Sequence, residues 1–527
     1  MQVERPLRRL VRISLIPGIL SVIGVVSFRT HAQEASTPVL VERVVREWTD
    51  PWGEARHDMR ISPTGRQLCY RSRHDNRWRI VIQDMVRDRT SCALDAVVDG
   101  PIFSPDGEHV VYVGELDGKQ LIIRDGVEHV GPTRYDQVAG RDSDDKPLFS
   151  PDSRHLAYRA RSGGKWVCVL DGNEGPKYDL VEQIRFSADS RHLAYVAGRA
   201  GREFVVRDGK EGPPYDEVCI YDIAPDGLRL AYVGHRDGKK LVVCDGRESP
   251  PYDDIGRVRL SPDGRRLAYA AKRAEKWFIV VDGEEGPAYD RLIYVEFSPD
   301  SRHLAYSTQR DHRSFVVLDG QEQTPPGDWP HFSPDSRLVY AAYHRETETW
   351  SYVYDGKLWP CGTSPERFSQ PIPMAFRPDG RQFAYYAYES GKGLWIVRDG
   401  RPGKVFRMVH RPEWSPDGNH LFYTAWRKGG PNYVVCDDMV NAVGGSAYWP
   451  TFSEDSRHFA YRIREKDVGD RVVCDGVKGP AHPEIRGLRA AAGKLHYVAY
   501  ERKGVRIVEV DWPAGRTWRD GFKAIDD

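Results

Sequence analysis

A four-residue turn motif recurs along almost the whole chain and limits what the chain can fold into. The motif is SPDG or a near variant, and successive copies are 42, 46, 37, 37, 37, 37, 35, 44, 38, 38 and 37 residues apart. A period of this size indicates a repeat architecture. The copies begin at Ser62, Ser104, Ser150, Ser187, Ala224, Ser261, Ser298, Ser333, Arg377, Ser415, Ser453 and, in degenerate form, Ala490.

Each repeat predicts four short β-strands. Residues 186–218 show the pattern, with β-branched and aromatic runs bounded by Gly, Pro, Asp and Ser. In the turn, Pro presets the first φ angle and Gly takes the left-handed position, so we expect Gly264 to be left-handed. A lone four-stranded sheet cannot bury both faces, whereas copies stacked around an axis can. The sequence therefore predicts an all-β fold, a β-propeller of about twelve four-stranded blades.

The segments FSPDGEHVVYVG, FSPDSRHLAYRA and LSPDGRRLAYAA resemble the WD40-like repeats of TolB-type propellers. The same repeat class builds the propellers of prolyl-oligopeptidase-type enzymes. The resemblance covers residues 58–522 and implies the propeller fold, with a TolB-like role in an envelope complex as an expectation by analogy. Because the repeats occupy almost all of the sequence, we expect neither the peptidase domain of those enzymes nor the separate N-terminal α/β domain of TolB.

Twelve blades exceed the four to eight of ordinary propellers, so we predict two propellers in tandem. Because TolB-type propellers are usually six-bladed, we place the domains at residues 33–293 and 294–527. A division of seven plus five blades at residues 320–330 stays open, since the spacing shortens there and TPPGD is typical of a joint. We expect the segment EWTDPWG, residues 47–53, to pair with a later blade and close the first ring.

Residues 1–32 have the pattern of a secretory signal peptide: a basic start, an apolar run and small residues at Thr30 and Ala32. We therefore expect a mature chain that begins at Gln33 and is periplasmic or secreted; an uncleaved membrane anchor is the alternative. Residues 1–32 hold five Arg and one Glu, which leaves 72 basic and 76 acidic residues of the 77 and 77. Without a basic surplus, nucleic acid is not an expected partner.

The eight cysteines do not predict a disulfide framework. Cys244, Cys436 and Cys474 hold the same place in three different repeats. Equivalent places in different blades are rotated apart, whereas a disulfide needs Cα atoms within about 7 Å. We expect mostly free thiols, and the absence of a C-x-x-C motif gives no support to a zinc site.

Two repeated sets of polar residues are candidates for a ring of ligand-binding groups, but a residue that recurs in every blade is expected to serve the blade. We therefore predict that each Tyr packs between blades, that each Asp accepts a turn N–H, and that each His marks a strand entry rather than a metal site. The sets are Tyr135-Asp136, Tyr178-Asp179, Tyr215-Asp216, Tyr252-Asp253 and Tyr289-Asp290, and His109, His155, His192, His303, His420 and His458.

Aromatic residues gather where the repeats lose their regularity, after residue 320. On propeller loops they could form a binding patch, or they could replace lost core packing, as we expect for Trp414. They are Trp329, Trp359, Trp414, Trp426 and Trp449.

The sequence carries no G-x-S-x-G elbow, H-E-x-x-H motif, P-loop or Rossmann fingerprint. We therefore assign no catalytic, cofactor-binding or metal residues, and expect no cofactor. The favoured hypothesis is an exported, non-catalytic propeller that binds a protein or peptide, or acts as a scaffold, in the periplasm or cell envelope. The alternatives are a lactonase-like or lyase-like propeller enzyme with its site in a central channel, and a structural spacer or surface-layer component.

Overall fold

The computed structural model describes residues 40, 42–49, 60–64, 67–84, 89–128, 134–138, 146–363, 374–427, 430–437, 439–491, 493–501 and 504–524. They all belong to one compact unit, Val39–Asp527. The predicted signal peptide, and the expected start of the mature chain at Gln33, lie outside the described residues. Within the described ranges, no helix is long and apolar enough to cross a membrane.

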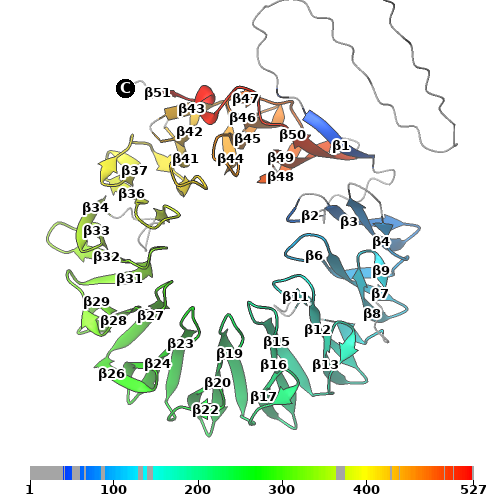
Figure 1. Cartoon of the computed structure of the whole chain (residues 1–527), viewed down its shortest axis with the longest axis vertical. Coiled ribbons are helices and arrows are strands. Elements are labelled where there is room, and N and C mark those ends of the chain that lie inside the picture. Colours follow the sequence, from blue (N-terminus) through cyan, green and yellow to red (C-terminus); the bar gives the residue numbers. More distant parts are fainter. Residues whose placement is uncertain are drawn as a thin grey trace, which may run out of the picture. The chain divides into compact units, whose positions relative to one another are not determined.

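The described chain forms twelve antiparallel blades that follow one another in sequence order (Figure 1). Eight are isolated four-stranded sheets; the first strands of blades 3 and 10 are each in two pieces; blades 8 and 9 are joined by one parallel pairing; and blade 10 gains a further strand from the C-terminal segment. The predicted all-β propeller blades are thus present.

Blades 1 to 3 consist of β2 (Arg60–Ile61), β3 (Gln67–His74), β4 (Arg77–Asp84) and β5 (Arg89–Thr90); β6 (Ala96–Phe103), β7 (Val110–Leu116), β8 (Lys119–Arg124) and β9 (Val127–Glu128); and β10 (Gln137–Val138), β11 (Leu148–Phe149), β12 (Leu156–Ser162), β13 (Lys165–Leu170) and β14 (Asn173–Glu174). Blades 4 to 6 consist of β15 (Leu180–Phe186), β16 (Leu193–Arg199), β17 (Arg202–Arg207) and β18 (Lys210–Glu211); β19 (Glu217–Ile223), β20 (Leu230–Arg236), β21 (Lys239–Cys244) and β22 (Arg247–Glu248); and β23 (Asp254–Leu260), β24 (Leu267–Arg273), β25 (Lys276–Val281) and β26 (Glu284–Tyr289).

Blades 7 to 9 consist of β27 (Arg291–Phe297), β28 (Leu304–Arg310), β29 (Arg313–Leu318) and β30 (Gln321–Glu322); β31 (Gly327–Phe332), β32 (Leu338–His344), β33 (Thr349–Tyr354) and β34 (Lys357–Thr363); and β35 (Ala375–Phe376), β36 (Phe383–Glu389), β37 (Gly393–Arg398) and β38 (Arg401–Pro402). Blades 10 to 12 consist of β39 (Met408–Val409), β40 (Glu413–Trp414), β41 (Leu421–Trp426), β42 (Asn432–Cys436), β43 (Met439–Val443) and β51 (Lys523–Ala524); β44 (Ser446–Phe452), β45 (Phe459–Glu465), β46 (Gly469–Cys474) and β47 (Val477–Lys478); and β48 (Glu484–Ala491), β49 (Lys494–Glu501), β50 (Gly504–Val510) and β1 (Glu42–Thr49). A short 3-10 helix, η1 (Trp518–Gly521), precedes β51.

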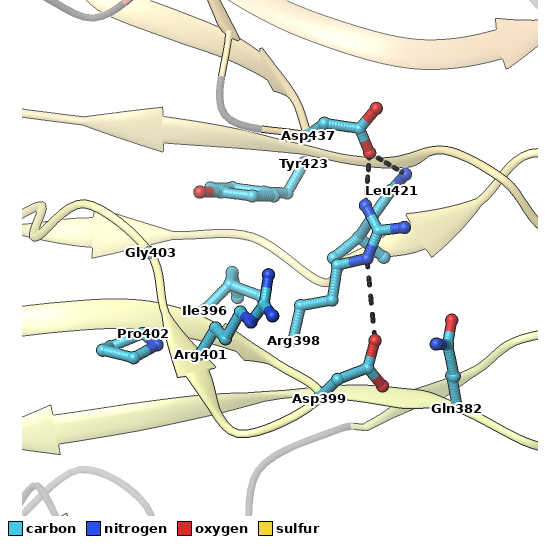
Figure 2. A pocket seen from close by; sticks show the side chains of 10 residues that line it. All are labelled: Gln382, Ile396, Arg398, Asp399, Arg401, Pro402, Gly403, Leu421, Tyr423 and Asp437. Carbon is cyan, nitrogen blue, oxygen red and sulfur yellow. Dashed lines mark hydrogen bonds and ion pairs between the residues drawn. The ribbon is translucent and has the colours of Figure 1, made fainter.

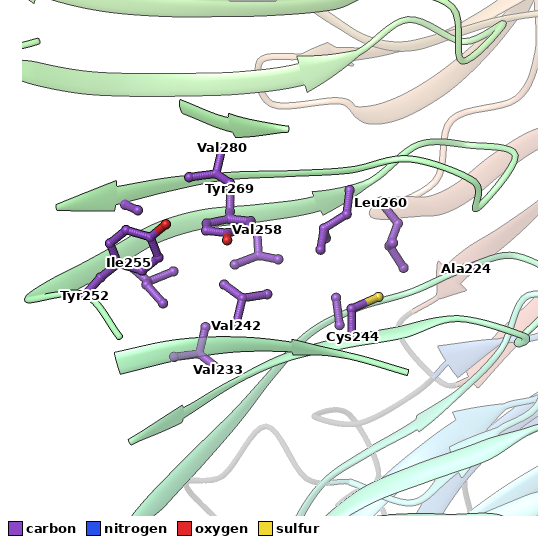
Figure 3. Close-up of a cluster of buried hydrophobic side chains, with 13 residues drawn as sticks. Ala224, Val233, Val242, Cys244, Tyr252, Ile255, Val258, Leu260, Tyr269 and Val280 are labelled. Atoms are coloured by element: carbon purple, nitrogen blue, oxygen red, sulfur yellow. The ribbon is translucent and has the colours of Figure 1, made fainter. Parts of the chain in front are cut away.

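The hydrophobic cores lie between blades rather than inside them. Figure 3 shows one, in which Val233 and Val242 of blade 5 pack with Tyr269 and Val280 of blade 6. Because both faces of a blade are covered by its neighbours, β20 is buried at five consecutive positions instead of at alternate ones. This packing requires every blade to have two neighbours.

The turn motif behaves as predicted. Gly264 has φ +71°, and its N–H donates to the carbonyl of Ser261 at 2.7 Å. In the SPDS variants the fourth residue is also left-handed although it is not glycine, as at Ser301, φ +66°.

The N-terminal strand β1 closes the series of blades. It pairs antiparallel with β50, from Glu42 opposite Val510 to Thr49 opposite Gly504, and so supplies the fourth strand of blade 12. Blade 12 also contacts blade 1, because Nη1 of Arg489 donates to the carbonyl of Ser62 at 2.7 Å. Glu47–Thr49, the described part of the segment 47–53, therefore pairs with a later blade, as expected, but that blade is the last of the twelve.

The predicted division into two six-bladed propellers, residues 33–293 and 294–527, is not shown by the structure and stays a prediction. Blades 6 and 7 share one core across that position, in which Ile279 and Tyr289 pack with Phe297 and Tyr306. The alternative joint at residues 320–330 is also bridged, because Val316 of blade 7 packs with blade 8. The blades form a continuous series since each of these junctions buries apolar side chains like the others.

Candidate functional site

The recurring Tyr-Asp pairs have structural roles. Each Tyr is at most 2% exposed and packs edge-on against a Tyr of the next blade, with ring centroids 6.0–6.4 Å apart. Each Asp accepts a hydrogen bond from a turn of the next blade, as Asp253 does from the N–H of Ala274 at 2.9 Å. These pairs join neighbouring blades, as predicted, and do not form an open ring of ligand groups.

The recurring histidines are also local to their blades. The Nδ1 atom of each lies 2.6–2.9 Å from the carboxylate of an Asp in the same blade, as His303 does with Asp319 at 2.7 Å. That Asp also accepts the N–H of Leu304, so it fixes the start of the strand. In the part of the chain that the structure describes, no group of three or more His, Cys, Asp or Glu could hold a metal ion.

No disulfide joins the eight cysteines, all of which are described, and the sequence predicted mostly free thiols. Cys244, Cys436 and Cys474 are buried. Burial raises the pKa of the Cys69 and Cys168 thiols to about 12, so neither is a nucleophile at neutral pH.

The five tryptophans belong to blades 8, 10 and 11 and have different surroundings. Trp359 packs against Phe383, with ring centroids 5.3 Å apart, and Trp414 donates its indole N–H to the carbonyl of Ala375 at 3.0 Å, so both serve the core. Trp426 and Trp449 are 38% and 45% exposed. The last, Trp329, lines a groove.

A cavity of about 470 Å³ lies between blades 9 and 10 (Figure 2). Arg398 reaches across it, donating to Asp437 at 2.5 Å and lying 4.0 Å from Asp399. Burial raises the pKa of Asp399, and the charge of Arg398 opposes that shift. Asp437 also accepts the N–H of Leu421 at 3.0 Å. These charges are already paired within the protein, so we interpret this cavity as structural.

The second hollow, of about 420 Å³, lies between blades 7 and 8; we call it the junction groove. Its walls include Trp329, Trp350 and Tyr343, whose rings pack in series: Trp350 is 5.9 Å from Trp329 and 5.0 Å from Tyr343. Tyr343 is 44% exposed. The remaining lining residues are His312, Arg313, Ser314, Pro326, Gly327, Asp328 and Arg345.

The groove combines an aromatic wall with two arginines, and no described residue forms an ion pair with Arg313 or Arg345. Aromatic and arginine side chains are the types that most often dominate protein-binding surfaces. Sequence reasoning singled out Trp329 but not the groove. The signal for it was the spacing of 35 residues after Ser298, the shortest in the chain.

No protein-family model matches the chain, and no curated protein matches it. Among solved structures it is similar to TolB from Acinetobacter baumannii, with 15% identity and a TM-score of 0.21 over 43% of this chain and 66% of TolB. It is also similar to the β-propeller domain of the Trilobed protease from Pyrococcus furiosus, which has an open velcro topology; identity is 13% and the TM-score 0.25, over 66% of this chain and 95% of that domain. At these identities the similarity concerns the fold.

Proposed function

We propose that this protein is an exported, non-catalytic β-propeller that binds a protein or peptide in the periplasm or cell envelope. The observation that supports the proposal most directly is the junction groove, in which three aromatic rings adjoin two arginines without a carboxylate partner among the described residues. Solvent-accessible Tyr and Trp beside Arg are characteristic of binding surfaces.

Capture from an envelope extract tests the proposal. The mature protein is immobilised beside two variants, Tyr343→Ala in the groove and Trp426→Ala, which removes an exposed aromatic of blade 10. We expect a defined protein to be retained by the wild type and Trp426→Ala, and reduced at least several-fold by Tyr343→Ala. Capture that is equal on all three columns would contradict a role for the groove.

A panel of lactone hydrolysis and eliminative lyase assays on the same preparation tests the enzymatic alternative. We expect no turnover above buffer. Turnover that survives in Tyr343→Ala would move the function away from the groove and support a propeller enzyme.

A further inference from the structure

The ordinary junction between blades shows what the junction groove lacks. In blade 4, Tyr215 follows the outer strand and exchanges two backbone hydrogen bonds with Glu203, at 2.8 and 3.0 Å. Equivalent pairings occur at Gln120 with Tyr135, Trp166 with Tyr178, Lys240 with Tyr252 and Trp277 with Tyr289. A Tyr therefore extends the outer edge of each of blades 2 to 6.

The Asp after that Tyr makes three further contacts. Asp216 pairs with the guanidinium of Arg202, accepts the N–H of Asp237 at 3.1 Å, and donates its own N–H to the carbonyl of His235 at 2.9 Å. In blades 2, 3, 5 and 6 the cation is a lysine, paired with the same carboxylate: Lys119 with Asp136, Lys165 with Asp179, Lys239 with Asp253 and Lys276 with Asp290.

Blade 7 lacks this Tyr-Asp pair. Before the point where the pair is missing, the backbone N–H of Gln323 donates to the carbonyl of Val316 at 2.8 Å. The N–H of Gly212 donates to the carbonyl of Val205 in the same way in blade 4. After that point, Gly327 stands opposite Ala342 in the sheet of blade 8, as Val218 stands opposite Gly234 in blade 5. Five residues, 213–217, separate the two reference points in blade 4, whereas only three, 324–326, separate them in blade 7. The two missing residues fall where Tyr and Asp stand in the other blades.

The groups that would contact the missing Asp line the junction groove, whereas Tyr340 and Ala342, which correspond to the ring contacts Tyr232 and Gly234 of Tyr215, are buried and do not line it. By register, Arg313 corresponds to Arg202, Ser314 to Glu203 and Tyr343 to His235. Arg345 begins the turn of blade 8 as Asp237 begins the turn of blade 5, although residues 345–348 make the first turn longer than residues 237–238 make the second. Among the described residues, nothing bridges to the backbone of Ser314 on this side, accepts from the N–H of Arg345 or pairs with the guanidinium of Arg313. The groove therefore offers a carboxylate site beside an unpaired length of strand.

We propose that the junction groove binds an extended segment of a partner protein in which an acidic residue follows an aromatic one, so that the acidic residue takes the place that the Asp of Tyr-Asp occupies in blades 2 to 6. The inference rests on the proposed binding function and names its ligand class. The segment would add to the edge of β29 through the backbone of Ser314. Its carboxylate would pair with Arg313 and accept the N–H of Arg345, and its aromatic ring would pack beside Trp329 and Trp350.

The probe is the synthetic peptide acetyl-Gly-Pro-Pro-Tyr-Asp-Glu-Val-amide, which reproduces residues 212–218, titrated into the mature protein by calorimetry. We expect saturable binding with one site. Replacing Asp of the peptide by Asn should weaken binding about tenfold, because the charge-assisted hydrogen bonds are lost.

Variants of the protein locate the site. Arg313→Gln should weaken binding about tenfold, and Arg313→Lys should restore it to within about threefold, because Lys holds this Asp in four other blades. The matched control is Arg202→Gln, whose Asp is already present, and it should bind as the wild type does. Insertion of Tyr-Asp between Pro325 and Pro326 should abolish binding, because the inserted Asp would itself occupy the carboxylate site of the groove.

Absence of binding up to about millimolar peptide, or equal affinity for the Asp and Asn peptides, would overturn the inference. Binding that is unchanged in Arg313→Gln would also overturn it. These results are separable from the proposed function, because capture of a protein that depends on Tyr343 would persist if the ligand class were wrong. Peptide binding without such capture would instead count against the proposed function.

Discussion

The hydroxyl of Ser301 in blade 7 accepts a hydrogen bond from the backbone N–H of Asp263 in blade 6, at 2.9 Å. The same contact recurs from Asp106 to Ser153, Asp152 to Ser190, Asp300 to Ser336 and Asp417 to Ser456. Each Ser is left-handed, at a turn position where other blades have Gly. In the SPDS variant, the Ser side chain therefore accepts a hydrogen bond from the preceding blade, but its backbone is strained at a φ angle that Gly adopts without strain.

The first prediction separates these two effects at Ser301. Ser301→Ala keeps the left-handed strain and loses the hydrogen bond, so the free energy of unfolding should fall by about 1 kcal/mol. Ser301→Gly loses the same bond but removes the strain, so its loss should be smaller. Urea unfolding measures both. Equal losses would show that the conformational term is negligible.

The second prediction concerns Gly264, at φ +71°. A Cβ there would lie 2.8 Å from the Cβ of Ala224 in the preceding blade. Gly264→Val should lower the free energy of unfolding by roughly 1–3 kcal/mol. The control is Gly238→Val, which has φ +73° but nothing within 4 Å of the added Cβ, and it isolates the backbone strain. A larger loss in Gly238→Val would contradict the importance of the contact between blades.

The third prediction is a pH dependence of ring closure. His482 of blade 11 is 3% exposed, and lies 3.1 Å from Glu42 of β1 and 2.8 Å from Glu501 of β49. Tyr497 donates to Glu42, and Arg506 is 3.6 Å from Glu501. Burial opposes the charged imidazole, but the hydrogen bonds to Glu42 and Glu501 outweigh it and raise the pKa of His482.

A raised folded-state pKa means that the contribution of His482 is complete below its unfolded value, about pH 6.5, and is lost as pH rises through the folded value. Unfolding by urea from pH 6 to 9 should therefore show falling stability in the wild type and a flatter profile in His482→Gln. The matched control is His303→Gln, which removes an exposed His-Asp pair that does not contact β1. A slope that persists in His482→Gln would assign the titration to another group.

The fourth prediction distinguishes one series of blades from two separate rings. Because blades 6 and 7 share a core, limited proteolysis should leave one resistant fragment that spans residue 293. Two stable halves after cleavage near Asp290 would instead support six plus six blades, and cleavage near Pro325 would support seven plus five. Mass spectrometry of the fragments decides between these outcomes.

The fifth prediction concerns β1. Removing residues 33–49 leaves the edge of β50 unpaired, so the variant should melt at a lower temperature and self-associate. A synthetic peptide of residues 40–49 should raise the melting temperature again, whereas a scrambled peptide should not. An unchanged melting temperature on deletion would show that β1 does not close the fold.

The sequence predicted the blade correctly, whereas the predicted grouping of the blades stays a prediction. Gly264 and its equivalents are visible within a few residues of sequence, because turn geometry is local. The partner of Glu42 lies at Val510, and nothing local to either residue specifies that pairing. The division of the blades into two propellers was inferred from the number of blades that is usual in TolB-type propellers. That number carries no information about the core in which Tyr289 packs with Phe297.

The junction groove shows the same limit. The shortened spacing between Ser298 and Ser333 was visible, but it suggested a joint between rings. Only the register of Gly327 with Ala342 shows that the missing residues are the ones that hold blades together elsewhere. A deletion in a repeat is therefore informative once the structural partners of the deleted residues are known.

The pairing of β1 with β50 also fixes the order in which the molecule can be completed. A ribosome makes Glu42 before any blade and Val510 after almost all of them, yet the two stand opposite each other in one sheet. During synthesis the first strand therefore has no pairing partner until the eleven other blades have been made. A nascent chain interrupted anywhere before β50 would have two uncovered ends, which favours the recognition of incomplete chains by chaperones and proteases.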